Sequence, residues 1–396
     1  MSLHPDNTRE NRLRRPCVFF YVQHLLGTGH VKRAALLTNA MRKMGMDVHM
    51  VNGGIPTTDL HKAPPEIQLP PLRAKDQSFK ILVNGGGREI DAQWKEQRCR
   101  ILLDHYRRVE PDVVVIETYP FGRRQLRFEL VPFLEEIHSS TKRPIVVCSV
   151  RDIVQARSRT RLVETRDILR TRFDHILVHG DPAFVQFDES YPCAEQMGQQ
   201  LHYTGYVATP WPPADSPHGH NEVLVSGGGG AVSTALLAAA IKARPLSRLR
   251  ASRWRVLAGP NVPERVFDTL KKDAGDGVII ERNRDDFAAM LRNCTLSVSQ
   301  CGYNTVIDLI QSAVRSVVVP FAGAGETEQS LRARKLALHG IAEVLTEGAL
   351  TPGALAGAID RCSAQPHPQH RPTLDLDGAS RSAQFVLDCW QRHTHG

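Results

Sequence analysis

A glycine-rich turn that ends in a histidine offers the first candidate chemistry. Gly27, Gly29 and His30 directly follow an apolar, strand-like run and precede a segment with helical periodicity. Glycines at such a turn let a ligand approach the backbone, and the amino end of the helix attracts negative charge. A neutral imidazole there can remove a proton from a hydroxyl group or water. His30 is therefore a candidate catalytic base, and a structural helix cap is the alternative.

A second glycine run occupies the same kind of turn in the other half of the chain. Four glycines follow Ser226, between a strand-like segment and a helical one. Without Cβ atoms, the N–H groups of Gly228 and Gly229 can point at a phosphate. A flexible turn without a ligand is the alternative, but the strand–turn–helix context favours an anion site.

The most specific pattern begins at Gln300. Gly302, Asn304 and Thr305 open a helix, and the free N–H groups of its first turn can meet a diphosphate. Asp308 follows about one turn later on the same face. That spacing suits a carboxylate that accepts hydrogen bonds from the diol of a ribose, although a solvated helix residue is the alternative.

Another glycine-rich loop follows the next predicted strand and leads to Glu328 and Gln329. At the start of a helix, a carboxylate and an amide can read the hydroxyl groups of a sugar. The alternative for Glu328 is a charge that complements the helix dipole. The order of these groups along the chain favours a single nucleotide-sugar pocket.

Glu117 directly follows a predicted strand. Ligands gather at the carboxyl ends of parallel strands, so Glu117 is expected near His30, either to orient the imidazole or to contact an acceptor. A hydrated loop residue is the alternative. Arg123, Arg124 and Arg127 come next and could recognise an acidic or phosphorylated acceptor, or form a solvated basic face.

These residues must be positioned by strands that alternate with helices, a pattern typical of parallel βαβ units. Helices are predicted at 31–44, 128–139 and 380–392. Strands are predicted at 18–22, 47–51, 113–116, 145–149, 175–179, 222–226, 255–258, 278–280, 296–299 and 316–319.

The predicted fold class is α/β, with two Rossmann-like domains that share a cleft, because the chain is too long for one ordinary domain. A Pro-rich segment that interrupts both periodicities marks the boundary. The predicted units are a disordered lead-in (1–16), an acceptor domain (17–207), a Pro-rich linker (208–220), a nucleotide-sugar domain (221–370) and a C-terminal helix (371–396) that could cross back to the first domain.

Composition excludes several classes of protein. The net charge of +8 comes with only 6% aromatic residues and dispersed arginines, so no nucleic-acid-binding stripe is expected. The eight cysteines form no CxxC pair, so neither disulfides nor a metal site is expected. No apolar run could span a bilayer, and the N-terminus lacks the apolar core of a signal peptide. We expect a cytoplasmic protein with at most peripheral membrane contact.

The C-terminal pattern resembles the signature of GT-B glycosyltransferases that use UDP-sugars. The matching residues are Cys301, Gly302, Tyr303 in place of Trp, Asn304, Thr305 in place of Ser, Asp308 for the ribose carboxylate, Pro320, and Glu328 with Gln329 for the sugar. The chain is also similar to the bacterial glycosyltransferase family 28, which adds N-acetylglucosamine to lipid-linked peptidoglycan precursors. That family shares the glycine loops matched at 27–30 and 227–230.

Two features complicate the resemblance. Gln300 stands where many of these enzymes have a histidine on the pyrophosphate, and glutamine cannot carry charge. Arg282, another basic group, or helix dipoles and backbone N–H groups must then compensate. The run from Gly27 to Arg33 is also similar to the GxGHxxR motif of nucleotide-sugar hydrolases of the same architecture.

The resemblance implies the GT-B fold and an inverting, metal-independent transfer, with His30 as the base. The nucleotide sugar is a substrate, and no cofactor is expected. The acceptor is left open and could be acidic, phosphorylated or lipid-linked. A hydrolase, a 2-epimerase and a non-catalytic nucleotide-sugar-binding protein are the alternatives.

Overall fold

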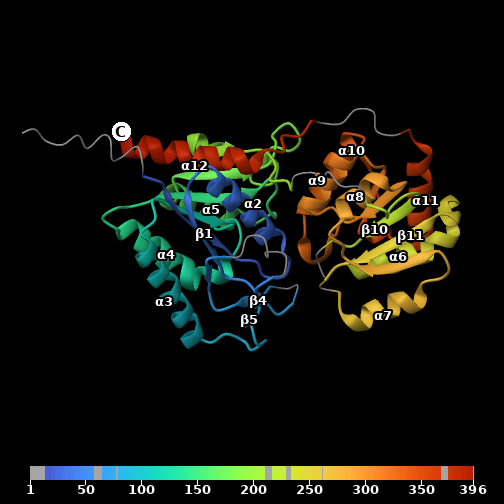
Figure 1. Ribbon diagram of the computed structural model, residues 1–396, viewed down its shortest axis with the longest axis horizontal. Helices are drawn as coiled ribbons and strands as arrows, with labels where there is room; N and C mark the ends of the chain where they lie inside the picture. Colours follow the sequence, from blue (N-terminus) through green and yellow to red (C-terminus); the bar gives the residue numbers. More distant parts are fainter. Residues whose placement is uncertain are drawn as a thin grey trace, which may run out of the picture.

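The computed structural model shows two α/β domains side by side, each built on a wholly parallel sheet (Figure 1). The two sheets follow one another along the chain, and the final helix returns to the first domain. The residues described are 14–57, 65–76, 79–209, 216–228, 233–260, 262–366 and 373–395.

The N-terminal sheet has the strand order β3-β2-β1-β6-β7-β8-β9. Its central strands are runs of Val, Ile and Phe, because helices cover both faces of the sheet. The strands are β1 (Cys17–Val22), β2 (Asp47–Asn52), β3 (Ile67–Gln68), β6 (Val113–Glu117), β7 (Ile145–Arg151), β8 (His175–His179) and β9 (Leu201–Tyr203), beside a small antiparallel pair of β4 (Leu72–Ala74) and β5 (Leu82–Asn84).

Alternate side chains of β1 serve two separate cores. Val18, Phe20 and Val22 pack with α2 and α12, whereas Phe19 and Tyr21 pack with α3, α4 and α5 on the other face. The domain is therefore a three-layer sandwich. Its helices are α2 (Gly29–Lys43), α3 (Ala92–Val109), α4 (Arg127–Ser139), α5 (Arg159–Arg172) and α12 (Gly378–His395), with short 3-10 turns η2 (Arg124–Leu126), η3 (Phe187–Glu189) and η4 (Ala194–Gln200).

The C-terminal sheet has the order β12-β11-β10-β13-β14-β15 and the same layering. Its strands are β10 (Glu222–Ser226), β11 (Arg253–Ala258), β12 (Val278–Arg282), β13 (Leu296–Ser299), β14 (Ser316–Val318) and β15 (Ala342–Val344). Its helices are α6 (Thr234–Ala243), α7 (Glu264–Asp273), α8 (Phe287–Asn293), α9 (Tyr303–Ser312), α10 (Glu328–Leu338) and α11 (Pro352–Ala364), with 3-10 turns η6 (Arg244–Leu246), η7 (Arg248–Ala251), η8 (Gly323–Gly325) and η9 (Glu347–Ala349).

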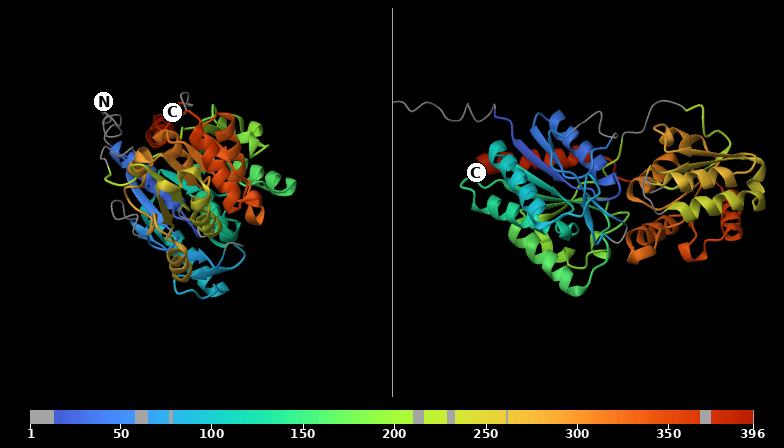
Figure 2. Two further views of the ribbon diagram at one scale, coloured as in Figure 1. Left: turned by 90° about the vertical axis from the view of Figure 1, so that its right-hand side faces the viewer. Right: turned by 90° about the horizontal axis from the view of Figure 1, so that it is seen from below.

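The predicted strands lie within two residues of the observed ones at each end. The predicted C-terminal helix is α12, and it lies against α2 of the N-terminal domain (Figure 2). Among the helices of the described ranges, none is long and apolar enough to cross a membrane.

The chain crosses between the domains twice, and the two crossings pair with each other. The Tyr206 N–H donates to the Asp375 carbonyl at 2.7 Å, and the Gly378 N–H donates to the Tyr206 carbonyl at 3.1 Å. A Cβ on Gly378 would lie 2.3 Å from the carbonyl oxygen of Gly205, so only glycine fits at that position. The paired crossings hold the start of α12 at the boundary.

A buried ion pair joins the two domains. Nη2 of Arg332 on α10 donates to Oδ1 of Asp152, just after β7, at 2.9 Å, and both side chains are almost wholly buried. The Tyr206 hydroxyl donates to the other oxygen of Asp152 at 3.0 Å. Because the ion pair is enclosed and hydrogen-bonded, it tolerates little relative movement of β7 and α10.

Tyr303 makes a second contact between the domains from the first residue of α9. Its hydroxyl donates to the carbonyl of His179 at 2.9 Å and accepts from the N–H of Val207 at 3.1 Å. The guanidinium groups of Arg33 and Arg332 lie 5.4 and 5.9 Å from the centre of its ring, within cation–π range. The amino end of α9 is thereby tied to the N-terminal sheet.

Replacement of Asp152 by Ala should therefore leave Arg332 as an uncompensated buried charge and lower the free energy of unfolding by about 3–5 kcal/mol. Addition of Arg332→Met to that variant should restore much of the loss. Chemical denaturation measures both effects. In the control, Glu96→Ala removes a partner of the exposed Arg100 and should change stability by less than about 0.5 kcal/mol. Equal losses in both single variants would contradict the role of the buried pair.

Candidate active site

The two glycine turns and their partner loops lie at the points where the strand order of each sheet reverses. In the N-terminal sheet this point is the carboxyl end of β1, which leads to His30, and of β6, whose last residue is Glu117. In the C-terminal sheet it is the end of β10 and β13, which lead to Gly228 and Gln300. Open α/β sheets bind their ligands at such points. The topology therefore directs both sets of candidate residues to ligand-binding positions.

The two sets meet across the domain boundary. A Cβ built on Gly29 would lie 3.6 Å from Nδ2 of Asn304, which is the nearest atom to it outside its own neighbours. Gly29 is the first residue of α2, and Asn304 is the second residue of α9. The amino ends of the two helices thus face each other, which places His30 beside the C-terminal half of the site.

His30 and Glu117 form a hydrogen-bonded pair. Nδ1 of His30 lies 2.9 and 3.0 Å from the two carboxylate oxygens of Glu117. The same carboxylate accepts from Arg33 and, at 2.7 Å, from the Thr118 hydroxyl. An ionised carboxylate can only accept, so Nδ1 carries the proton and Nε2 of a neutral ring keeps its lone pair. This is the arrangement of an imidazole that acts as a base and is oriented by a carboxylate.

Charge and burial keep this imidazole neutral. Burial has the largest effect and lowers the pKa of His30 to about 3; Glu117 opposes the shift, and the charges of Arg123 and Arg151 add to it. Burial alone would raise the pKa of Glu117, but His30 and Arg33 outweigh it and hold that pKa well below its usual range. At neutral pH the pair is therefore an imidazole hydrogen-bonded to a carboxylate.

The amino end of α9 provides the opposite half of the site. Its N-cap is Gly302, which has no side chain to cap the helix, so the first-turn N–H groups, including those of Asn304 and Thr305, remain open to a ligand's anion. Burial raises the pKa of Asp308, one turn further along, to about 7, and Lys32 of α2 opposes that shift. Asp308 therefore lies on the face of α9 that looks toward the N-terminal domain.

Glu328 and Gln329, the pair predicted to bind the sugar, both form hydrogen bonds within the protein. Glu328 is buried and accepts from Nη2 of Arg151 at 2.9 Å. Oε1 of Gln329 accepts from the backbone N–H groups of Cys301 and Phe321 at 3.0 and 3.1 Å. The amide oxygen of Gln329 therefore joins the loop that contains Cys301 to the loop that contains Phe321. Glu328 is thus paired across the domain boundary and Gln329 within its own domain, and their predicted contact with the sugar stays a prediction.

Arg282, one of the groups predicted to compensate for Gln300, bonds to a neighbouring loop. Nη1 of Arg282 donates to the carbonyls of Gly259 and Val262 at 3.2 and 2.8 Å, and Nη2 donates to Glu264 at 2.5 Å. The guanidinium thus fastens the loop between β11 and α7, whereas Gln300 is buried at the end of β13.

The second glycine turn is described only in part. Gly228 has a φ of +63°, which favours glycine, and its N–H donates to the Ser226 hydroxyl at 3.2 Å. A Cβ on Gly227 would lie 2.3 Å from the hydroxyl oxygen of Ser233. These glycines allow a tight turn at the end of β10. Gly229, also predicted to bind the ligand, lies outside the described residues.

Sequence reasoning missed the roles of Arg33 and Arg151. Arg33, one turn after His30 on α2, reaches Glu117 and the ring of Tyr303. Arg151 ends β7 and reaches Glu328 in the other domain. Arg151 and Glu117 both lie at the carboxyl end of a parallel strand. The rule that ligands gather at such ends could therefore have identified Arg151 as well.

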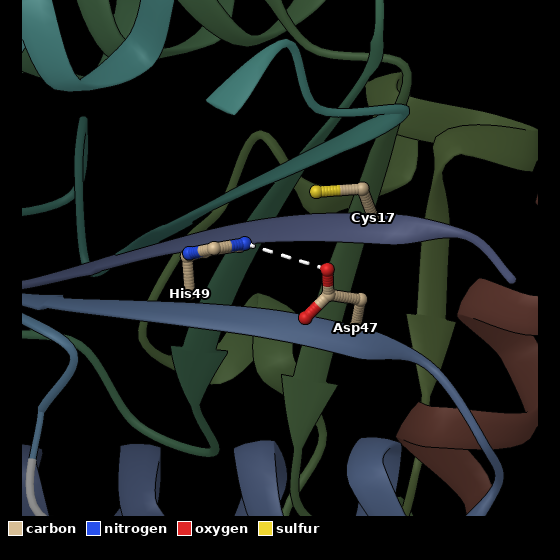
Figure 3. Close-up of side chains that lie close together, drawn as sticks. All are labelled: Cys17, Asp47 and His49. Carbon is tan, nitrogen blue, oxygen red and sulfur yellow. Dashed lines mark ion pairs between the residues drawn. The ribbon is translucent and has the colours of Figure 1, made fainter. Parts of the chain in front are cut away.

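A separate group of potential metal ligands lies at the opposite edge of the N-terminal sheet. Cys17, Asp47 and His49 have donor atoms that all lie within 4.8 Å of one another (Figure 3). They lie at the starts of β1 and β2, whereas His30 follows the carboxyl end of β1. Burial, which is the largest influence, raises the pKa of the Cys17 thiol to about 11, so loss of its proton to a metal would be costly. This group plays no part in the chemistry at His30.

Residues 223–382 match the glycosyltransferase family 28 C-terminal domain. Two curated relatives are UDP-N-acetylglucosamine–N-acetylmuramyl-(pentapeptide) pyrophosphoryl-undecaprenol N-acetylglucosamine transferases. The protein of Phenylobacterium zucineum is 30% identical over 162 residues, which are 40% of this chain and 43% of that protein. The protein of Methylibium petroleiphilum is 38% identical over 81 residues, which are 20% and 22%. This chain thus matches less than half the length of either relative.

Solved structures match nearly the whole chain. The calicheamicin glycosyltransferase CalG4 aligns over 96% of this chain and 97% of its own, with a TM-score of 0.59 and 14% identity. MurG of Acinetobacter baumannii aligns over 95% and 99%, with a TM-score of 0.56 and 17% identity. These matches confirm the predicted α/β GT-B fold with two Rossmann-like domains. The resemblance to family 28 is confirmed for the C-terminal domain.

The low pKa of His30 predicts acid sensitivity. In the unfolded chain a histidine titrates near 6.5, so below that pH the unfolded state binds the proton more readily. The contribution of His30 to stability is therefore present above pH 6.5 and is lost as the pH falls toward 3. Between pH 7 and pH 5 the contribution of His30 to the free energy of unfolding should fall by about 2 kcal/mol. This part of the acid response should be absent in His30→Gln.

Urea unfolding at the two pH values measures the difference. The control is His49→Gln at the opposite sheet edge, which should keep the acid sensitivity of the wild type. An acid response in His30→Gln that equals that of the wild type would show that His30 is already protonated in the folded protein.

Proposed function

We propose that this chain, whose C-terminal domain is of the glycosyltransferase family 28 type, transfers a sugar from a nucleotide sugar to a hydroxyl group of an acceptor. One observation carries the proposal: His30, held by Glu117, lies in the first turn of α2, which faces the uncapped amino end of α9. A base on one side and an anion-binding helix end on the other are what sugar transfer from a diphosphate requires.

In the proposed reaction, Nε2 of His30 takes the proton of the acceptor hydroxyl. The acceptor oxygen forms a bond to the anomeric carbon while the bond from that carbon to the diphosphate oxygen breaks. Attack from the face opposite the leaving group inverts the anomeric configuration. The negative charge that develops on the nucleoside diphosphate is stabilised by the N–H groups of Asn304 and Thr305 and by the dipole of α9. These fixed dipoles can do this without a metal ion.

The same geometry supports a position for the nucleotide of the donor. Asp308 lies one turn after Asn304, so a diphosphate at the amino end of α9 brings the adjoining ribose to that carboxylate. The names of the two curated relatives specify UDP-N-acetylglucosamine as their donor. We therefore propose a UDP-sugar, with the amide nitrogen of Gln329 and the carboxylate of Glu328 as candidate contacts to the sugar.

The acceptor is proposed from the relatives as well. Their names specify a pyrophosphoryl-undecaprenol acceptor, which combines a lipid with phosphate. An acceptor of that chemistry would bring the protein to a membrane surface. We propose a cytoplasmic reaction with at most peripheral membrane contact. A hydrolase remains the second candidate because the motif from Gly27 to Arg33 ends in an arginine that also contacts Glu117.

His30→Ala should lower turnover by roughly a hundredfold or more, because the acceptor hydroxyl loses its base, and should leave the affinity for nucleotide nearly unchanged. The assay measures nucleotide released from a panel of nucleotide sugars, with and without a cell extract that supplies acceptors. His49→Ala is the control and should retain full turnover. Full turnover in His30→Ala would contradict the assignment of the base.

The same assay separates the second candidate from the first. Release that depends on the extract supports a transferase, whereas brisk release in buffer alone identifies a hydrolase. Conversion of the sugar without net loss of nucleotide would indicate an epimerase.

The raised pKa of Asp308 predicts that nucleotide affinity depends on pH. Below about pH 7 the carboxyl group becomes protonated and can no longer accept from both hydroxyls of the ribose. If only the ionised form binds well, UDP should bind about tenfold more weakly at pH 6 than at pH 8. Isothermal titration calorimetry at the two pH values measures this difference. Asp308→Asn should bind UDP weakly at both pH values. If this variant kept the full pH dependence of the wild type, Asp308 would not be the group that contacts the ribose.

A further inference from the structure

The three arginines near His30 differ in their partners. Arg33 pairs with Glu117, and Arg151 pairs with Glu328. Arg123 is different: its Nε donates to the backbone carbonyl of Gln23 at 2.8 Å. Within the described ranges, no carboxylate lies at ion-pair distance from Arg123. Of Arg33, Arg123 and Arg151, Arg123 is thus the one without a carboxylate at ion-pair distance in the described ranges.

The neighbours of Arg123 in the sequence do not share this property. Arg124 and Arg127 both pair with Glu164 of α5, which draws their guanidinium groups toward that helix. Arg123 has a φ of +65°, in the left-handed region that an arginine rarely adopts. This backbone conformation points the side chain of Arg123 in a different direction from that of Arg124. Tertiary structure therefore divides the three arginines into two that pair with α5 and one that turns to the site.

Arg123 lies close enough to influence the groups at the base. Its charge contributes to the low pKa values of His24 and His30. Burial, which is the largest influence, and Arg151 lower the pKa of Arg123 itself, whereas the charge of Glu117 opposes that shift. His24 is 4% exposed, and its Nδ1 has no hydrogen-bond partner within the described part of the chain. A guanidinium without a carboxylate at ion-pair distance can gain charge-assisted hydrogen bonds from an anionic ligand.

We infer that Arg123 binds a phosphate group of the acceptor. This inference rests on the proposed function and adds to it the residue that recognises the acceptor. The planar guanidinium can donate two parallel hydrogen bonds to phosphate oxygens. Its Nε is already held by Gln23, so the outer nitrogens are left for a ligand.

The position of Arg123 distinguishes acceptor from donor. Arg123 lies between β6 and α4 of the N-terminal domain, on the same side of the boundary as His30. The donor's diphosphate is assigned to the amino end of α9, in the other domain. A phosphate held by Arg123 therefore belongs to the molecule whose hydroxyl His30 deprotonates.

The test is calorimetric titration of the full chain with inorganic pyrophosphate, after saturation of the donor site with UDP. Arg123→Gln should weaken pyrophosphate binding at least about tenfold and leave the UDP affinity within about twofold, because a single bidentate anion contact is lost. Arg123→Lys keeps the positive charge but not the planar guanidinium that donates two parallel hydrogen bonds, so the loss of pyrophosphate affinity should be intermediate. Arg124→Gln is the matched control and should bind as the wild type does. Thermal unfolding should show both glutamine variants to be folded.

Three outcomes would overturn the inference while the proposed function stands. They are wild-type protein that binds UDP but no pyrophosphate, an Arg123→Gln variant with unchanged pyrophosphate affinity, and a loss of UDP affinity in Arg123→Gln, which would assign the arginine to the donor. Failure of the wild type to bind UDP, dTDP or GDP would instead contradict the proposed function and, with it, this inference.

Discussion

The buried ion pair between Asp152 and Arg332 is the constraint on which the site depends. It joins the end of β7 in one domain to α10 in the other, and Arg332 also donates to the carbonyl of Cys301, just before α9, at 3.3 Å. Two charges enclosed in this way are stable only in one geometry. The pair therefore fixes where α9 begins relative to the first turn of α2, which carries His30.

Around that constraint, the two halves of the site have different electrostatics. The N-terminal half holds His30 neutral and leaves Arg123 without a counter-ion, whereas the C-terminal half offers the uncapped end of α9 and the readily protonated Asp308. One half can accept a proton and bind an anion, and the other can stabilise a departing diphosphate. The division of labour follows from burial and charge pairing as much as from residue type.

Much of the fold could be predicted from the sequence because its signals are local. Buried parallel strands are continuous apolar runs, so β1, β6, β8 and β10 were located to within a residue or so. The short edge strands β3 and β9 carry too few apolar residues to stand out. The glycine turns before His30 and after Ser226 were recognisable because both lie between a strand and a helix.

The sequence by itself determined the class of fold, the two domains, and the presence of His30, Glu117 and the α9 motif at strand ends. Only the tertiary structure decided how the charged groups pair. It assigned Arg282 to a loop, Gln329 to two backbone N–H groups and Arg123 to the site. Periodicity reports which way a side chain leaves its own element. The partner that the side chain meets depends on the packing of elements far apart in the chain, which no local pattern encodes.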